Sequence, residues 1–134
     1  MTRHGIFASH TLADAFSLEG VPHSFDGAFL GFWWSHLPAQ SIGRFLEVLT
    51  AHLAPAAKVI AIDNRFVEGS STPISRADEQ GNTFQLRSLD DGTTFEVLKN
   101  FSSAQELELA VAPFAATSRV TELTFYWILK FGLR

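Results

Sequence analysis

The sequence predicts an α/β fold in which a largely parallel sheet carries helices on both faces. Three observations lead to this prediction: a nearly unbroken apolar run over 25–34, a one-sided amphipathic stretch after Pro38, and a β-branched apolar run over 58–63. Such runs are typical of strands covered on both faces, and a helix between two of them allows the strands to run parallel. The crossover is expected to be right-handed.

The first half of the chain is predicted to hold this crossover. Residues 5–12 are predicted as a short strand, and residues 25–34 as the central strand of the sheet. One buried helical face follows, with apolar residues three and four positions apart: Ile42, Phe45, Leu46, Leu49 and Leu53. Pro55 disfavours the helical conformation of the residue before it, so we expect the helix to end at Ala54. The strand 58–63 then ends in the carboxylate of Asp63.

The second half is predicted to carry a loop, a hairpin, a helix and two closing strands. Residues 65–82 are rich in Ser, Gly, Pro, Asp and Glu, which indicates a surface loop. Two alternating segments flank Asp90-Asp91-Gly92, so 83–99 is predicted as an inserted antiparallel hairpin. Ser103 and Glu106 have the spacing of a capping box at the start of a helix. Residues 119–123 and 125–131 are predicted as closing strands, with an antiparallel strand at the end.

Composition limits the classes of function that need to be considered. A chain of 134 residues with 46% hydrophobic residues is expected to form a single domain over 1–134. The net charge of -4 is spread without long runs, which argues against nucleic acid as a partner. The chain contains no cysteine, its histidines lack metal-ligand spacing, and no apolar run has the length of a membrane span. We therefore expect a cytoplasmic protein without a metal or a membrane partner.

Two motifs resemble those of a known family. Asp14-Ala15-Phe16 is an acidic residue followed by a small one, and Phe25-Asp26 opens an apolar strand that ends in Gly31-Phe32-Trp33. From Ala13 to the terminal strands, the chain resembles the class I S-adenosylmethionine-dependent methyltransferases. The resemblance is to the C-terminal part of their Rossmann-like sheet, because the glycine-rich turn of the cofactor half has no counterpart here. It implies mainly parallel strands, an inserted hairpin and an antiparallel terminal strand.

The resemblance also implies a cofactor and the residues that contact it. S-adenosylmethionine is the expected cofactor, with Asp14 and Ala15 at its adenine amino group and Phe16 beside the ring. Gly31, Phe32 and Trp33 are expected to face it from the end of their strand, since ligands of open α/β sheets bind outside the carboxyl ends of strands. The implied reaction transfers a methyl group to a small-molecule acceptor.

Catalytic and acceptor-binding residues are expected at the same edge. His36 follows the first strand, and its imidazole titrates near neutral pH, so it is the candidate general base. Asp63 and Asn64 close the next strand and are candidate substrate-binding residues. Each has a structural alternative: Asp14, Asp63 and Asn64 are also common turn residues, and His36 also suits a capping or surface position.

Three classes of function remain open. The first is a truncated methyltransferase that is weak or inactive alone because its N-terminal half is missing. The second is a non-catalytic binding or scaffold protein of the same fold that forms a homodimer through its exposed sheet edge. The third is a small ligand-binding α+β module of another family, in which the hairpin and long loop form a cup. A parallel pair between strands 25–34 and 58–63 favours the first two, whereas an entirely antiparallel sheet favours the third.

Overall fold

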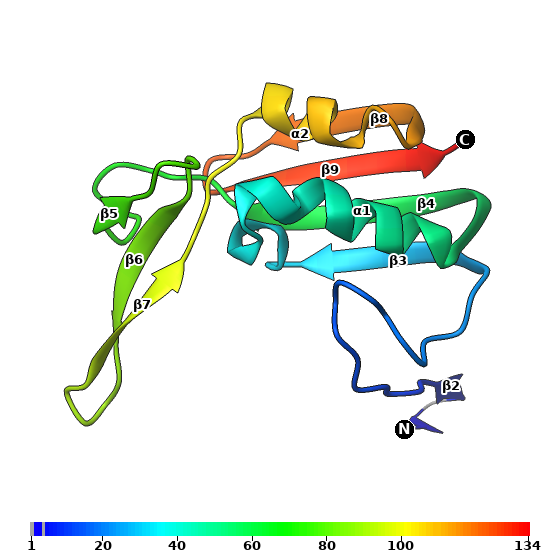
Figure 1. The fold of residues 1–134 in the computed structure, drawn as a ribbon, viewed down its shortest axis with the longest axis horizontal. Coiled ribbons are helices and arrows are strands. Elements are labelled where there is room, and N and C mark those ends of the chain that lie inside the picture. Colours follow the sequence, from blue (N-terminus) through cyan, green and yellow to red (C-terminus); the bar gives the residue numbers. More distant parts are fainter. Residues whose placement is uncertain (1, 4) are drawn as a thin grey trace.

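A computed structural model of the protein describes residues 2–3 and 5–134. Its main sheet has four strands in the order β3-β4-β9-β8, and a three-stranded arm in the order β5-β6-β7 projects from one end (Figure 1). The strands are β1 (Thr2–Arg3), β2 (Ile6–Phe7), β3 (Phe25–Gly31), β4 (Leu53–Asn64), β5 (Arg76–Ala77), β6 (Thr83–Ser88), β7 (Thr94–Leu98), β8 (Ala115–Glu122) and β9 (Tyr126–Leu133). The helices are the 3-10 turns η1 (Trp34–His36) and η2 (Ala39–Ser41), and α1 (Ile42–Ala51) and α2 (Ala104–Val111).

The predicted crossover is confirmed in its order and direction. Strands β3 and β4 pair in parallel, with Gly27 opposite Lys58, and α1 connects them. The helix ends three residues before the predicted Ala54, because the His52 backbone N–H closes the last turn onto the Leu49 carbonyl oxygen. Strand β4 therefore begins earlier than predicted and includes Pro55 near its start, where a proline interrupts a ladder least.

The prediction of a mainly parallel sheet is wrong. Strand β9 pairs antiparallel with β4, and β8 pairs antiparallel with β9, so β3–β4 is the one parallel pairing in the described part of this sheet. The cause lies in the connection at residues 123–125, which is too short for a crossover and forces β8 and β9 to run in opposite directions.

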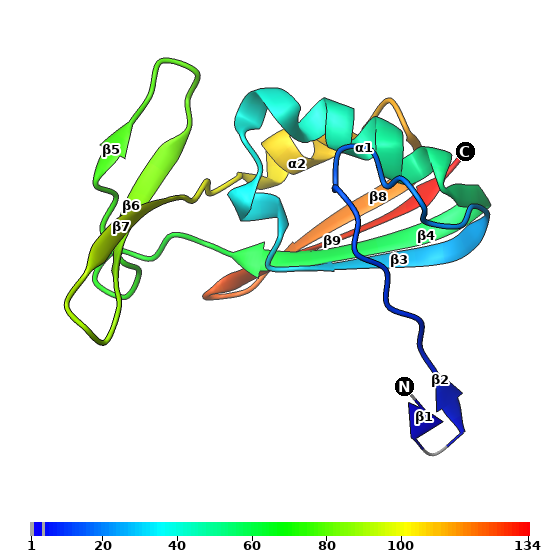
Figure 2. The ribbon, with the colours of Figure 1, turned by 60° about the horizontal axis from the view of Figure 1, so that its bottom comes forward.

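The prediction of helices on both faces is also wrong for the described residues. Helices α1 and α2 cover the same face of the sheet (Figure 2). They pack against alternate residues of the central strands in one core that includes Phe45, Leu46, Val59, Ala61, Leu107, Val111, Leu129 and Phe131. On the opposite face, which we call the open face, Phe29 is 69% exposed and Ile60 is 38% exposed. The run 25–31 is thus covered on one face, although its composition predicts cover on both.

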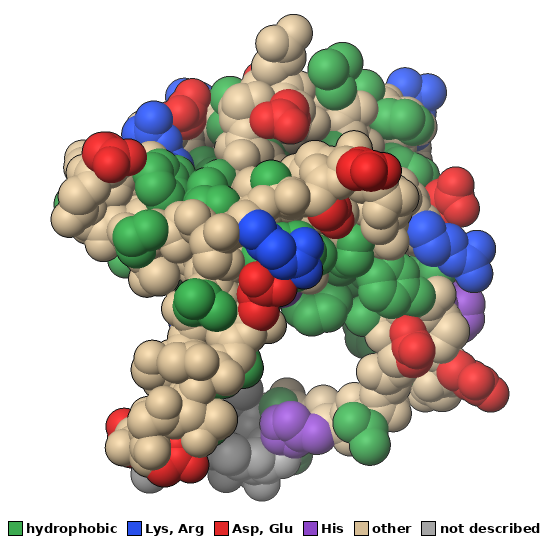
Figure 3. Space-filling model, turned by 60° about the vertical axis from the view of Figure 1, so that its left-hand side comes forward, with side chains coloured by type: hydrophobic (Ala, Val, Ile, Leu, Met, Phe, Trp, Pro, Cys, Tyr) green, Lys and Arg blue, Asp and Glu red, His purple; other side chains and the backbone are tan. Residues whose placement is uncertain are grey.

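The arm contains the predicted hairpin, formed by β6 and β7, and the predicted surface loop contributes the short strand β5 to it. A buried amide, Asn82, attaches the arm to the body. Its Oδ1 accepts hydrogen bonds from the Ala39 backbone N–H at 2.7 Å and from Asn100 Nδ2 at 2.9 Å, and its Nδ2 donates to Gln40 Oε1 at 3.0 Å. Acidic, basic and hydrophobic side chains are interspersed over this end of the molecule (Figure 3).

The remaining local predictions have mixed outcomes. The strand expected over 5–12 is replaced by a hairpin of β1 and β2, and residues 8–12 are not in a strand. The capping box at the start of α2 is confirmed, because the Glu106 backbone N–H donates to Ser103 Oγ and the Ser103 N–H donates to the Glu106 carboxylate. Among the helices of the described residues, none has the length and apolar character to cross a membrane.

Candidate functional site

The carboxyl ends of β3 and β4 lie side by side and form the edge where the candidate residues gather. The Phe32 backbone N–H donates to the Ile62 carbonyl oxygen at 2.9 Å, which fastens the end of β3 to β4. Phe32 has a φ of 55°, in the left-handed region that bulky residues rarely adopt. This sharp change of direction leads the chain into η1, so residues 33–36 lie against the end of β4.

A buried polar cluster, which we call the Asp63 cluster, lies under this edge and contains Asp63, Ser35, Asn64 and Lys99. Asp63 accepts hydrogen bonds from the backbone N–H groups of Ser35 at 2.8 Å and Asn64 at 2.7 Å. Lys99 Nζ lies 3.3 Å from Asp63 Oδ1 and donates to Ser35 Oγ at 2.8 Å and Asn64 Oδ1 at 2.9 Å. The ammonium group therefore has three oxygen partners, the arrangement that a buried charge requires.

The sequence does not predict that Lys99 or Ser35 belongs to this cluster. Lys99 follows a strand of the exposed hairpin and precedes a polar residue, a context typical of a solvated lysine. Its burial arises because the arm returns to the body at this point, where Asn100 N–H donates to the Ser35 carbonyl oxygen at 2.7 Å. The one sequence feature that pointed to a polar cluster here was the carboxylate of Asp63 at the end of the predicted strand 58–63.

Two of the predicted cofactor residues, Phe16 and Trp33, contact the same residue of α1, Phe45. Asp14 Oδ1 accepts the Phe16 N–H at 2.7 Å, so the carboxylate shapes the turn that contains Ala15. The Phe16 ring contacts Phe45 edge-on, with centroids 6.4 Å apart, and the Trp33 ring lies 6.0 Å from the same Phe45 ring. The structure thus brings the 14–16 turn next to the end of β3.

The other predicted residues at the end of β3 face away from Phe45, with Gly31 toward Phe29 on the open face and Phe32 toward Tyr126. Gly31 is exposed at the strand end, and Phe32 is 48% exposed with its ring edge-on to Tyr126 at 6.0 Å. Trp34, by contrast, is buried in the core against Trp127. Of the two adjacent tryptophans, Trp33 therefore belongs to the edge and Trp34 to the core.

His36 is half-buried and has a defined tautomer when neutral. Its Nδ1 lies 3.0 Å from the Leu98 carbonyl oxygen. Because a carbonyl oxygen only accepts hydrogen bonds, Nδ1 carries the proton of this hydrogen bond. In the neutral ring, Nε2 then holds the lone pair, which is the form that a general base needs.

Two cavities lie near this edge, and one of them is lined by Asn64 and Lys99 of the Asp63 cluster. The smaller, of about 330 Å³, is lined by Asn64, Arg65, Ser70, Ser71, Thr72, Gln85, Arg87, Lys99, Phe101, Phe125 and Tyr126. We call it the arginine pocket. It shares Tyr126 with the contact to Phe32, so it opens beside the exposed aromatic end of β3.

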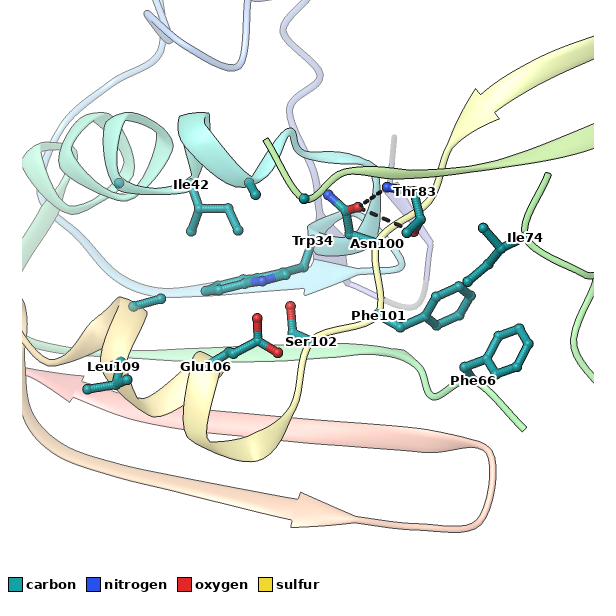
Figure 4. A pocket seen from close by; sticks show the side chains of 14 residues that line it. Trp34, Ile42, Phe66, Ile74, Thr83, Asn100, Phe101, Ser102, Glu106 and Leu109 are labelled. Carbon is teal, nitrogen blue, oxygen red and sulfur yellow. Dashed lines mark hydrogen bonds between the residues drawn. The ribbon is translucent and has the colours of Figure 1, made fainter. Parts of the chain in front are cut away.

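The larger cavity, of about 690 Å³, lies between α1, α2 and the arm (Figure 4). Its walls are mostly apolar, with Trp34, Ile42, Phe66, Ile74, Phe101 and Leu109 among them. Buried Trp34 Nε1 is without a hydrogen-bond partner in the described structure. No group of three or more His, Asp and Glu side chains in residues 2–3 and 5–134 has the arrangement of a metal site.

The chain matches no family model, and its sequence matches no curated protein. Its fold is similar to those of several solved structures. The complex of DhpI with SAH has a TM-score of 0.66 and 21% identity, and the match covers 90% of this chain and 52% of DhpI. A SAM-dependent methyltransferase from Methanosarcina mazei has a TM-score of 0.68 and 18% identity, with coverage of 98% and 69%.

A third structure is the 1,6-didemethyltoxoflavin-N1-methyltransferase from Burkholderia thailandensis, with a TM-score of 0.54, 14% identity and coverage of 90% and 48%. These likenesses show that the chain has the fold of SAM-dependent methyltransferases, as the two motifs in its sequence predict. The chain spans about half to two-thirds of the length of the three structures.

Proposed function

We propose that this chain is the acceptor-side part of a methyltransferase that transfers a methyl group from S-adenosylmethionine to a small molecule. One observation carries the proposal: β3 and β4 run parallel, and antiparallel β9 lies between β4 and β8, in a fold that matches SAM-dependent methyltransferases over 90% or more of this chain. Ligands of such sheets bind at the carboxyl edge, where the candidate residues gather.

In this proposal, the wall formed by Phe16, Phe45 and Trp33 receives the cofactor. Asp14 and Ala15 contact the adenine amino group, Phe16 flanks the ring, and Gly31 and Phe32 lie along the cofactor at the end of β3. The short distances from Phe45 to both Phe16 and Trp33 support this arrangement.

The acceptor is proposed to bind in the arginine pocket, beside Asn64. Asp63 was also a candidate for substrate contact, but its side chain is fully buried beneath Ser35, Asn64 and Lys99. We therefore assign Asp63 a positioning role, in which its carboxylate fixes the Asn64 backbone and the Lys99 ammonium. Two similar structures are the DhpI-SAM-HEP complex and the Burkholderia thailandensis methyltransferase with bound 1,6-didemethyltoxoflavin, which fits an acceptor of small size.

The chemistry needs few groups from the protein. When bound, the cofactor would supply an electrophilic methyl group on its sulfonium for in-line transfer to the acceptor atom, with S-adenosylhomocysteine as the leaving group. The chain's contribution is to hold the acceptor in near-attack geometry and to exclude water, which can account for a large part of the barrier. Where the acceptor carries a proton, His36 Nε2 is the proposed group that removes it, and since His36 does not line the arginine pocket, the reacting end of the acceptor would have to extend beyond that pocket.

We further propose that the 134 residues bind the cofactor weakly and are inactive alone. The glycine-rich turn that the resembling family uses is not among them, and the free edge of β3 and the open face are available to a segment that carries it. Two observations support this role for the open face: Phe29 is 69% exposed, and β3 pairs on one side only within the described residues.

A chemical-shift titration of the isotope-labelled chain with S-adenosylhomocysteine tests the proposal, because it detects millimolar binding. We expect saturable shifts confined to residues 14–16 and 31–33, and weaker binding by Asp14→Ala and Trp33→Leu. Asp26→Ala is the matched control, since Asp26 lies at the other end of β3. Absence of saturable shifts, or equal binding by Asp14→Ala, would overturn the cofactor site.

A second candidate function is a non-catalytic scaffold that associates with itself through the edge of β3. The open face supports it, because Phe29, Ile60 and Tyr126 are exposed apolar side chains of the kind that another chain can cover. Sedimentation of the chain and of a Phe29→Ser, Ile60→Thr variant separates the two. A dimer that dissociates in the variant, together with no response to S-adenosylhomocysteine, favours the scaffold.

A further inference from the structure

We propose that the acceptor carries an anionic group, a carboxylate, phosphate or phosphonate, and that Arg87 binds this group in the arginine pocket. The assignment of the ligand as the methyl acceptor rests on the proposed function. The binding of a small acid at Arg87 does not, because it follows from the charges and contacts of the pocket itself.

The charged side chains that line the pocket are all positive. Its wall contains Arg65, Arg87 and Lys99, and none of its lining residues is Asp or Glu. Lys99 is committed to Asp63, at 3.3 Å, and Arg65 is paired with Glu122, at 3.1 Å. Arg87 has no carboxylate oxygen within 4.0 Å among the described residues. Its charge is the one in this pocket that a protein carboxylate does not balance.

The Arg87 side chain is held in place by a buried neighbour. Arg87 Nη2 donates to Gln85 Oε1 at 2.9 Å, and Gln85 Nε2 donates to the Thr72 carbonyl oxygen at 2.9 Å. Gln85 is 2% exposed, so this support is rigid. The contact uses one of the five N–H donors of the guanidinium group, and the others suit a carboxylate or phosphate, which arginine binds with two parallel hydrogen bonds.

The other walls define the size and character of the ligand. Phe101, Phe125 and Tyr126 provide an apolar surface, and Ser70 and Ser71 provide hydroxyl groups. Ser71 Oγ accepts the Val67 N–H at 2.8 Å, which leaves its hydroxyl hydrogen to donate to an anion. A volume of about 330 Å³ lies at the lower end of small-molecule pockets. The ligand class is therefore a small organic acid with an apolar body.

The position of Arg87 would fix the orientation of such an acid in the pocket. Arg87 lies on β6 of the arm, whereas Asn64 ends β4 at the edge of the main sheet, and both line the pocket. An acid whose anionic end is held at Arg87 would extend its other end toward the edge where we place methyl transfer.

A titration in the absence of any cofactor tests this inference. The probes are phenylphosphonate, benzoate, inorganic phosphate and the neutral benzamide, each added to the labelled chain while chemical shifts are recorded. We expect the two aromatic anions to bind more tightly than benzamide, with shifts at Ser71, Thr72, Gln85 and Arg87. Added salt should weaken the anions and leave benzamide unchanged.

Substitution of the arginine gives the decisive comparison. Loss of a charged hydrogen-bonding partner should lower the affinity of Arg87→Gln for both aromatic anions by roughly tenfold or more. Arg87→Lys should retain part of the affinity, and Arg44→Gln, on the exposed face of α1 outside the pocket, should match the parent. Equal affinity for anions and benzamide, or an unchanged affinity in Arg87→Gln, would overturn the inference.

The outcomes separate this inference from the proposed function. Anion binding at Arg87 without any response to S-adenosylhomocysteine would leave the acid site standing and remove the methyltransferase assignment. Cofactor-induced shifts at residues 14–16 with no anion binding at Arg87 would support the methyltransferase assignment and contradict the acid-binding site. Arg87 is exposed, so its substitution is expected to leave the far-ultraviolet circular dichroism spectrum unchanged, which checks that the variant is folded.

Discussion

Lys99 and Asp63 lie 36 positions apart in the sequence and meet with Nζ 3.3 Å from Oδ1, where their side chains are 7% and 0% exposed. One residue follows the arm and the other belongs to the central sheet, so this pair joins the two parts of the fold at the candidate site. The arrangement makes the stability of the body and the placement of the arm depend on the same contact.

Removal of one partner of this pair should be strongly destabilising. Asp63→Ala leaves the Lys99 ammonium buried without a counter-charge, and the Ser35 and Asn64 N–H groups lose their acceptor. We expect the free energy of unfolding to fall by about 3–5 kcal/mol, measured by denaturant titration. Glu122→Gln, which breaks an exposed ion pair with Arg65, should change it by less than about 1 kcal/mol. Similar effects of the two substitutions would contradict the importance of burial.

Substitution of Asn82 should loosen the arm. Asn82→Ala removes the acceptor shared by the Ala39 N–H and Asn100 Nδ2, of which Asn100 Nδ2 still donates to the Leu37 carbonyl oxygen, and each hydrogen bond lost costs about 0.5–1.5 kcal/mol. We expect amide hydrogen exchange to accelerate in β6 and β7 more than in β4 and β9. Gln80→Ala, which removes one exposed hydrogen bond to Gln40, is the control and should leave exchange in the arm unchanged. Uniform acceleration across the molecule would argue that the arm and body unfold together.

The attachment of the arm should weaken in acid. The pKa of Asp78 lies below its ordinary value of 3.8, mainly because its carboxylate accepts a hydrogen bond from the Asn82 backbone N–H. Hydrogen bonds from the Asn82 side chain and the Gln80 N–H lower this pKa by smaller amounts. A lowered pKa in the folded state means that the stabilisation is complete above pH 3.8 and is lost as the pH falls through the folded value. Asp78→Asn should therefore be less stable than the parent at neutral pH, with the difference disappearing in acid. A difference that persists at low pH in denaturant titrations would contradict this.

The unpaired indole nitrogen of Trp34 predicts an unusual response to substitution. Trp34→Phe removes a buried donor that has no partner and keeps an aromatic ring in the core, so the lost packing and the removed polar group offset each other. We expect a change in unfolding free energy within about 1 kcal/mol, compared with a loss of about 3–5 kcal/mol for Trp34→Ala. A large loss in Trp34→Phe would indicate that Nε1 donates to a bound molecule in the native protein.

Local signals account for the parts of the fold that the sequence predicted well. The hairpin around Asp90-Asp91-Gly92, the capping box of Ser103 and Glu106, and the order of the first crossover all depend on residues close together in the chain. The direction of most strand pairings and the one-sided cover of the sheet depend on contacts between distant segments. The apolar run 25–31 specifies a strand that can be covered on both faces, but no residue in it specifies what covers the face of Phe29.

The candidate site shows the same division. Asp63, Asn64 and His36 could be selected because they lie at or just after the ends of predicted strands, and the structure places them at the carboxyl edge of β3 and β4. Lys99 and Arg87 could not be selected, because a cation on an exposed hairpin is usually solvated. Their roles arise from the burial of Lys99 against Asp63 and from the support that Gln85 gives to Arg87.

Because the open face can receive a binding partner, the midpoint temperature of thermal unfolding of this chain should depend on which partner is bound there. Any molecule that binds the folded chain and not the unfolded one raises that midpoint in proportion to the logarithm of its concentration. Candidate partner segments can thus be ranked by melting curves alone, before any catalytic assay exists, and the sensitivity of Phe29 and Ile60 variants to each segment would map where it docks.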